Sequence, residues 1–148
     1  MEIQSIKISE LTENQILDFG EVVLGDNDII QYSLTHDPIP FHIDKEFAEK
    51  SHFKGLIASG PHLFHIFYTR EWIPRFKNTV YAGRGVTNWM MERPVYANAT
   101  SYCKCHVKKI DPKPERGFNV IHWYFEFTNE KNELLQALDL IVLHYLEI

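Results

Sequence analysis

Two neighbouring segments decide the organisation of this chain: Thr35-His36-Asp37-Pro38-Ile39-Pro40-Phe41-His42-Ile43-Asp44 and Lys54-Gly55-Leu56-Ile57-Ala58-Ser59-Gly60-Pro61-His62. Two prolines stiffen the first segment, and each biases the residue before it, Asp37 or Ile39, toward extended backbone. Asp37 and His42 therefore lie at either end of a short rigid segment, and we expect their side chains to converge on one point.

A carboxylate and an imidazole at one point suit general acid–base catalysis, because the two groups can divide proton donation and abstraction near neutral pH. The alternative interpretation is structural: Asp37 caps a turn and His42 is a hydrogen-bonded core histidine. For an arbitrary Asp and His at this spacing, the structural interpretation is the more common one. The pair alone therefore leaves both open.

Short helices are predicted on either side of this pair. Residues 25–28 are expected to form a turn in which Asp26 or Asn27 caps a short helix that runs through about Ser33. Asp44 is expected to cap a further helical turn that presents Phe47 and Ala48 inward.

The second segment leads into an apolar helix. Ser59 or Gly60 can cap this helix, and Pro61 falls in the first turn, where its missing N–H costs nothing. We predict a helix from about Pro61 to Ile73 that ends at Pro74 and is about 20 Å long. A helix that is apolar nearly all round is a buried one. The apolar positions are Leu63, Phe64, Ile66, Phe67, Tyr68, Trp72 and Ile73.

The start of this helix has a chemical use. Its free N–H groups carry partial positive charge, and Gly60 has no side chain to keep a ligand carbonyl away from them. The oxygen of a thioester or an ester could be polarised there. A helix start of this kind, next to the Asp37 and His42 pair, shifts the balance toward a catalytic site.

The same residues resemble those of a known family. The order Asp-x-x-Pro-x-His between Asp37 and His42 is similar to that of the MaoC-like hydratase/dehydratase family, the (R)-specific enoyl-CoA hydratases of the hot-dog fold. The match covers roughly residues 33–63, with a fainter match at residues 92–98. It continues through Asp44, Phe47, Ala48, Phe53, Ile57 and Gly60.

The resemblance implies a fold and a reaction. The fold is α+β, a single hot-dog domain over residues 1–148 with a curved antiparallel sheet wrapped around the central helix. The reaction is hydration of trans-2-enoyl thioesters, or the reverse dehydration of 3-hydroxyacyl thioesters. No metal or redox cofactor is expected, because CoA or the pantetheine of a carrier protein arrives as part of the substrate.

The resemblance also implies roles for single residues. The catalytic residues are Asp37 and His42, which hold and activate water, and Gly60, whose N–H stabilises the enolate-like oxygen. The expected substrate-binding residues are Ile39, Phe41, Phe47, Phe53 and Ser59.

The chain departs from the family pattern in three places. Ile39 stands where the family usually has Asn, so a hydrogen-bonding group is missing from the loop. Ser59-Gly60 stands where His-Gly is usual, and Ala97-Asn98 replaces a Gly-Asp turn. Two alternative functions therefore stay open: a non-catalytic subunit that binds acyl thioesters, and a hot-dog acyl-CoA thioesterase. Many such thioesterases place a carboxylate on or beside the central helix, where the first one here is Glu71.

Composition narrows the class of protein. With 148 residues, 45% of them hydrophobic and 14% aromatic, the chain is long enough for one well-filled core. The formal net charge of −5 gives no electrostatic reason to expect nucleic acid or an anionic membrane as partner. No apolar stretch reaches the length of a membrane span, and the first ten residues do not read as a signal peptide. The expected location is the cytoplasm.

Strand patterns fill the second half of the chain. We predict strands at 80–93, 100–110, 118–127 and 134–146, joined by hairpin-length turns, and an opening strand within 11–23. Within 118–127, apolar residues alternate with His122 and Glu126, which is typical of a half-buried strand. The apolar residues that share this face are Ile121, Trp123, Phe125 and Phe127. The last segment could be read as helix on composition, and the resemblance favours strand. Cys103 and Cys105 are expected to be reduced, half-buried thiols. Because single hot-dog domains expose a sheet edge, we expect at least a homodimer, with residues 80–93 as the contact.

Overall fold

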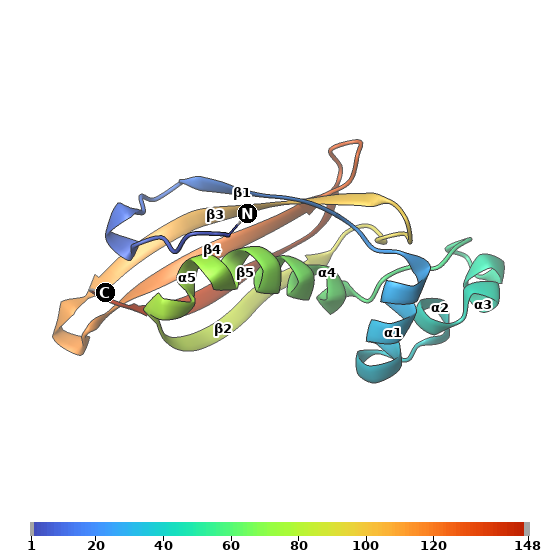
Figure 1. Ribbon diagram of the computed structural model, residues 1–148, viewed down its shortest axis with the longest axis horizontal. Coiled ribbons are helices and arrows are strands. Elements are labelled where there is room, and N and C mark those ends of the chain that lie inside the picture. The colour runs from blue at the N-terminus through green and yellow to red at the C-terminus, as the bar shows by residue number, and fades with distance from the viewer. Residues whose placement is uncertain (1, 147–148) are drawn as a thin grey trace.

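The computed structural model describes residues 2–146, which form one five-stranded antiparallel sheet with a helical run across one face (Figure 1). The strand order is β1-β3-β4-β5-β2, so β1 and β2 are the two edges. This arrangement is the α+β architecture that was expected. The strands are β1 (Ile16–Val23), β2 (Val80–Met91), β3 (Thr100–Lys113), β4 (Phe118–Thr128) and β5 (Leu134–Tyr145).

The helices fall into two groups. One group, α1 (Asp26–His36), α2 (Pro40–Ile43) and α3 (Lys45–Lys50), lies beyond one end of the sheet, whereas the other crosses the sheet (Figure 1). Within residues 2–146, no helix combines the length and apolarity required to cross a bilayer. The crossing group is α4 (Gly60–Phe67), η2 (Tyr68–Trp72), α5 (Ile73–Phe76) and η3 (Lys77–Thr79), and two short turns, η1 (Ile8–Glu10) and η4 (Pro114–Arg116), lie elsewhere.

The core lies between the helical run and the inner face of the sheet. Alternate residues of β4 are buried there, as the sequence pattern predicted. Aromatic rings from the helices meet them edge to face: Phe64 lies 5.2 Å from Phe125, and Trp72 lies 5.7 Å from Trp123, measured between ring centroids. Large aromatic rings therefore fill the space between the sheet and the helical run. The β4 residues on this face are Ile121, Trp123, Phe125 and Phe127.

The two cysteines of β3 share this inner face. Cys103 pairs with Phe127, and Cys105 pairs with Phe125. Both cysteines are fully buried, so the expectation that they would be half-buried is wrong. Burial raises the pKa of each thiol well above its usual range, because the thiolate would lose its hydration. Both thiols behave as small apolar core residues.

The last segment is a strand, which settles the ambiguity between helix and strand. β5 lies between β4 and β2, and most of its residues are buried without alternation. One face of β5 meets the helical run, where His144 accepts a hydrogen bond from Trp123 Nε1 (3.1 Å) and bonds Thr79 Oγ1 through Nδ1 (2.8 Å). On the other face, Asp139 accepts from Lys108 Nζ (3.1 Å). Burial on both faces explains a continuous apolar composition.

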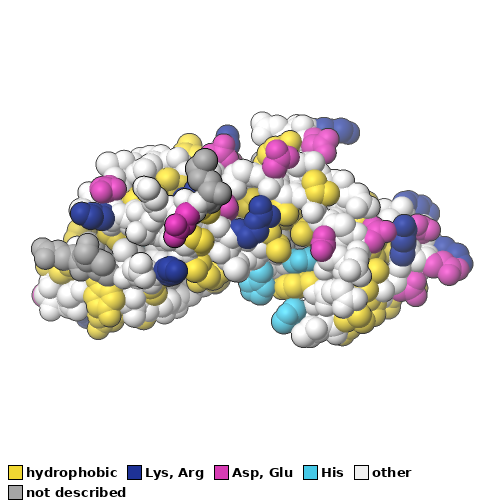
Figure 2. All heavy atoms as spheres, viewed as in Figure 1, with side chains coloured by type: hydrophobic (Ala, Val, Ile, Leu, Met, Phe, Trp, Pro, Cys, Tyr) yellow, Lys and Arg dark blue, Asp and Glu magenta, His cyan; other side chains and the backbone are white. Residues whose placement is uncertain are grey.

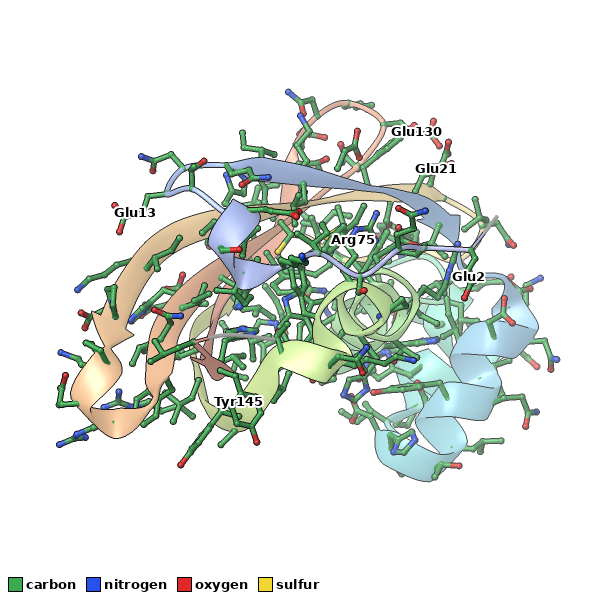
Figure 3. All side chains as sticks on the ribbon, turned by 60° about the vertical axis from the view of Figure 1, so that its left-hand side comes forward. Glu2, Glu13, Glu21, Arg75, Glu130 and Tyr145 are labelled. Atoms are coloured by element: carbon green, nitrogen blue, oxygen red, sulfur yellow. The ribbon has the colours of Figure 1, made fainter. Side chains whose placement is uncertain are left out.

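The helical run does not end at Pro74, so that prediction is wrong. A proline inside a helix lacks an N–H and its ring crowds the carbonyl four residues earlier. Here a π-helical turn, η2, precedes it: the N–H of Ile73 donates to Tyr68 O, five residues back. The wider turn lets the chain continue through Pro74 into α5. Arg75 then donates to Glu71 O (2.7 Å) and lies over the Phe19 ring, between the run and β1 (Figure 3).

The helices α1 and α3, on either side of α2, each begin at a residue that forms a local capping hydrogen bond. Gly25, rather than Asp26 or Asn27, is the N-cap of α1, and its N–H donates to the side chain of Asp28 (3.0 Å). α1 continues to His36 instead of ending near Ser33. Asp44 caps α3 as predicted, because its Oδ1 accepts from Phe47 N (3.0 Å). As a result, Asp37 follows α1 directly and His42 lies within α2, with a short non-helical break between the two helices.

Candidate active site

A pocket of about 450 Å³ opens where the start of α4 meets α2 and the chain that follows β2. Asp37, His42 and Gly60, the three predicted catalytic residues, all line this pocket. Its remaining walls are mostly apolar. They come from Phe41, Phe53, Ile57, Ala58, Pro61, Met91, Glu92, Arg93, Pro94, Val95 and Gln136.

The local fold brings the carboxylate and the imidazole together. Asp37 ends α1, where its N–H donates to Ser33 O (2.9 Å), and Pro40 begins the single turn of α2 that carries His42. The turn reverses the chain, so His42 Nε2 lies 3.4 Å from Asp37 Oδ2. The link between them is therefore a single helical turn without a side-chain cap, not a wholly extended segment.

Hydrogen bonding fixes which nitrogen of His42 faces Asp37. The imidazole is buried, and its Nδ1 lies 2.6 Å from the carbonyl oxygen of Ile57. A carbonyl only accepts, so Nδ1 carries the hydrogen and donates it. Ile57 is itself held by a bridge to Tyr96, in the segment after β2. The ring is thus oriented with Nε2 toward Asp37 and the pocket.

Ser59 holds the Asp37 carboxylate and does not itself line the pocket. Its Oγ donates to Asp37 Oδ2 at 2.7 Å, and its side chain makes no capping bond to α4, although Ser59 occupies the N-cap position. Ser59 is completely buried and is absent from the pocket wall. The structure therefore places this predicted substrate-binding residue behind Asp37 rather than against a ligand.

Gly60 begins α4 with a free donor and a close neighbour. Within residues 2–146 its N–H has no acceptor, as expected at the first position of a helix. The space that a Cβ would need is filled by the Met91 side chain, whose Sδ would lie only 2.6 Å away. The absence of a side chain at this position therefore accommodates Met91, which we had not anticipated.

The other predicted substrate-binding residues divide into two groups. Phe41 and Phe53 line the pocket, with their rings 5.1 Å apart and edge to face. Ile39 and Phe47 do not line it and are 42% and 50% exposed. Phe47 was expected to point inward, and only its neighbour Ala48 does so. In a helix as short as α3, one narrow face is available for burial.

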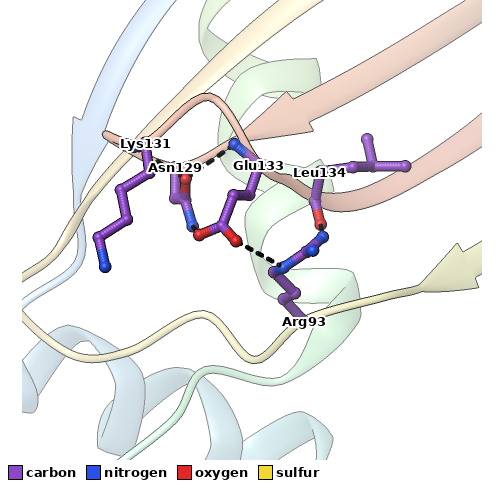
Figure 4. Close-up of polar contacts among 5 residues, drawn as sticks. All are labelled: Arg93, Asn129, Lys131, Glu133 and Leu134. Carbon is purple, nitrogen blue, oxygen red and sulfur yellow. Dashed lines mark hydrogen bonds and ion pairs between the residues drawn. The ribbon is translucent and has the colours of Figure 1, made fainter.

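Sequence reasoning missed the wall formed by residues 91–95 and Gln136. Arg93 lies at this wall: it donates to Leu134 O (2.8 Å) and its Nε lies 3.4 Å from Glu133 Oε2 (Figure 4). The β4–β5 hairpin thus braces one side of the pocket. A signal was present for Gln136, because it is a single amide within the apolar run of β5.

Histidines gather beside the pocket, where the helical run meets α1 (Figure 2). The Tyr32 ring stacks on His62 at 4.0 Å, and its hydroxyl bonds His65 Nδ1 at 2.7 Å. Burial lowers the pKa of His62 to about 4. Burial and the nearby Asp37 carboxylate raise the pKa of Tyr32. Within the described part of the chain, no group of three or more His, Cys, Asp and Glu is arranged to hold a metal ion.

The chain is similar in sequence to known proteins. The sequence profile described as the MaoC like domain matches residues 6–121. The chain is 27% identical over 113 residues to the uncharacterized protein YdeM of Bacillus subtilis (strain 168), covering 75% of this chain and 78% of that protein.

Solved structures share the fold. The MaoC-like dehydratase from Rhodospirillum rubrum superposes with a TM-score of 0.83 at 22% identity, covering 95% of this chain and 97% of the other. The R-hydratase PhaJ1 from Pseudomonas aeruginosa, in its unliganded form, gives 0.79 at 20% identity, covering 97% and 88%. At these identities the likeness concerns the fold, which is the hot-dog fold.

Proposed function

Since the chain belongs to the MaoC-like domain family, we propose that it catalyses the reversible hydration of trans-2-enoyl thioesters to (R)-3-hydroxyacyl thioesters. One observation carries the proposal. His42 Nε2 and Asp37 Oδ2 face each other at 3.4 Å on the pocket wall that also bears the N–H of Gly60, for which residues 2–146 supply no acceptor. An acid–base pair and an oxyanion donor on one wall are what addition of water to a conjugated thioester requires.

The dyad is arranged to take a proton from water. Because Nδ1 of His42 donates to Ile57 O, Nε2 offers a lone pair, and the Asp37 carboxylate is also an acceptor. A water molecule has two O–H donors and satisfies both acceptors at once. As the water oxygen bonds to C3 of the substrate, its proton passes to one member of the dyad, and the dyad delivers a proton to C2.

The start of α4 is arranged to stabilise charge on the thioester. When water adds at C3, the electrons of the C2=C3 bond move toward C1, and negative charge develops on the thioester oxygen. The free N–H of Gly60 and the positive end of the helical run favour charge at that point. Both reacting groups approach from the same wall, so we expect addition of the hydroxyl and the proton to one face of the double bond.

The structure offers less support for the thioesterase alternative. Glu71, the first carboxylate of the helical run, does not line the pocket. Its side chain lies 3.4 Å from Arg75 Nη1, and both side chains are largely buried. A paired carboxylate away from the pocket is poorly placed to activate water against a bound thioester.

One assay separates the candidate functions. Purified protein is incubated with crotonyl-CoA and longer trans-2-enoyl-CoAs while loss of conjugated thioester absorbance and release of free thiol are followed together. Hydration removes conjugation without releasing thiol, hydrolysis releases thiol, and a binding subunit does neither. Because general acid–base groups contribute about 10²–10⁴-fold each, Asp37→Asn and His42→Ala should each slow hydration at least 100-fold. Full activity in both variants would contradict the assigned dyad.

A further inference from the structure

Gln136 is a buried amide on the wall of a pocket whose lining is mostly apolar. It lies on β5, paired with Met91 of β2 on one side and Phe127 of β4 on the other, and it is 1% exposed. Its side chain forms part of the pocket wall. Cross-strand neighbours share a face of the sheet, so Gln136 lies beside the methionine that covers Gly60.

Trp89 fixes the orientation of this amide. The indole nitrogen of Trp89 lies 2.9 Å from Gln136 Oε1. An indole N–H can only donate, so the atom that faces it must be the amide oxygen. Trp89 is itself held against the ring of Phe64, at 5.5 Å and edge to face, and does not line the pocket. The amide oxygen is therefore bonded away from the pocket.

The NH₂ group of Gln136 is left with two free donors. It has no acceptor within residues 2–146. In that part of the chain, the fully enclosed side-chain nitrogens and oxygens without a partner belong to other residues, so the Gln136 nitrogen is not sealed in the core. The open space that its side chain borders is the pocket. The enclosed atoms belong to Ser33, His62, Trp72 and His106.

We propose that Gln136 selects acyl thioesters whose acyl chain carries a hydrogen-bond acceptor oxygen, rather than a plain hydrocarbon chain. This inference rests on the proposed function and specifies its substrate class. A hydrocarbon chain that enters the pocket removes water from the amide and returns no bond, and a buried donor without a partner is unfavourable. A chain with an ether, carbonyl or hydroxyl oxygen at the right carbon restores that bond.

Ether substrates provide the sharpest test, because an ether oxygen accepts and never donates. The pairs are 4-methoxy-trans-2-butenoyl-CoA with trans-2-hexenoyl-CoA, 5-methoxy-trans-2-pentenoyl-CoA with trans-2-heptenoyl-CoA, and 6-methoxy-trans-2-hexenoyl-CoA with trans-2-octenoyl-CoA. Within each pair, oxygen replaces one methylene. We expect kcat/KM to favour the ether by about tenfold in at least one pair, as one hydrogen bond to a buried donor implies. Equal values in all three pairs would overturn the inference.

Two variants connect the preference to Gln136. Gln136→Met keeps the length of the side chain and removes the donors, so it should reverse the preference toward the hydrocarbon. Trp89→Phe leaves the pocket wall unchanged and frees the amide to turn, so it should weaken the preference. If Gln136→Met instead slows every substrate by the same factor, the amide bonds the thioester carbonyl, and the inference about the acyl chain is wrong.

A binding measurement separates this inference from the proposed reaction. If no enoyl thioester is hydrated, the proposed function fails, and calorimetry with the saturated 6-methoxyhexanoyl-CoA and octanoyl-CoA, together with the two shorter saturated pairs, still tests the pocket. Tighter binding of an ether by wild type, lost in Gln136→Met, would support the inference without any reaction. Equal affinities throughout would overturn it.

Discussion

Ser59→Ala is the substitution that tests how the dyad is held. It removes the Oγ–H that donates to Asp37 Oδ2 at 2.7 Å, and it changes no atom of the pocket wall. Without this bond, the carboxylate of Asp37 can rotate away from His42. We expect kcat to fall while KM for an enoyl thioester changes little, because the substrate does not touch Ser59.

The structure bounds the size of this effect. A hydrogen bond to a charged group contributes about 1.5–3 kcal/mol, which corresponds to roughly 10- to 150-fold in rate. The side chain of Asp37 is 32% exposed, so water can replace part of the lost bond. The expected fall in kcat is therefore near the lower limit, about tenfold. The same access of water should limit the loss of stability to about 1 kcal/mol or less.

A second serine supplies a matched control. Ser33 on α1 is also completely buried, and its hydroxyl has no partner in the described part of the chain. Ser33→Ala should keep the wild-type kcat and leave the melting temperature unchanged or slightly higher, because it removes an unpaired buried hydroxyl. The reasoning is refuted if Ser59→Ala retains the wild-type kcat while Asp37→Asn is inactive, or if both serine variants lose activity equally.

Three further predictions concern the loop, the buried histidines and the sheet edge. Ile39→Asn should raise hydratase activity or leave it unchanged, since Ile39 is exposed, off the pocket wall and at the uncapped start of α2; a large fall in kcat with the fold intact would mean that Ile39 contacts the acyl chain. Burial lowers the pKa of His62 and of His144 to about 4, below the ordinary value of about 6.5, so the unfolded chain binds protons first and stability should fall between pH 6.5 and 4, by up to about 3 kcal/mol per histidine. Urea unfolding at pH 7, 5.5 and 4.5 measures this, and His144→Gln should flatten the dependence. Light scattering at micromolar concentration should give at least a dimer through the exposed edge of β2, and Val86→Lys should shift it toward monomer; a monomeric wild type would contradict this.

Local patterns predicted the fold where one physical signal dominates. The alternation in β4 and the cap at Asp44 each express one preference, burial on one face or an N–H to satisfy, and both are confirmed. Pro74 failed as a stop signal because the π turn before it depends on how the run packs on the sheet, which no short window contains. β5 was ambiguous because burial on both faces erases the period of two.

The site residues that lie close together in the sequence could be predicted, whereas those that strand pairing brings to the pocket could not. Asp37, His42 and Gly60 lie within 24 residues, and a rigid loop with a helix start was enough to bring them to one pocket. Met91 and Gln136 reach the same pocket through the pairing of β2 with β5. Register of that kind is set by the whole sheet, so the local sequence marks Gln136 only as an isolated amide in an apolar run and does not place either residue in the pocket.

The contact between Met91 and Gly60 constrains how the sequence can change over generations. A side chain at position 60 would meet the sulfur of Met91 at about 2.6 Å, so Gly60→Ala requires the flexible end of the Met91 side chain, which is 56% exposed, to move aside. The reverse order, a shortening at 91 followed by a gain at 60, meets no such obstacle. We therefore expect a modest coupling between the two positions among descendants, with a side chain at position 60 tolerated best where position 91 has already become shorter.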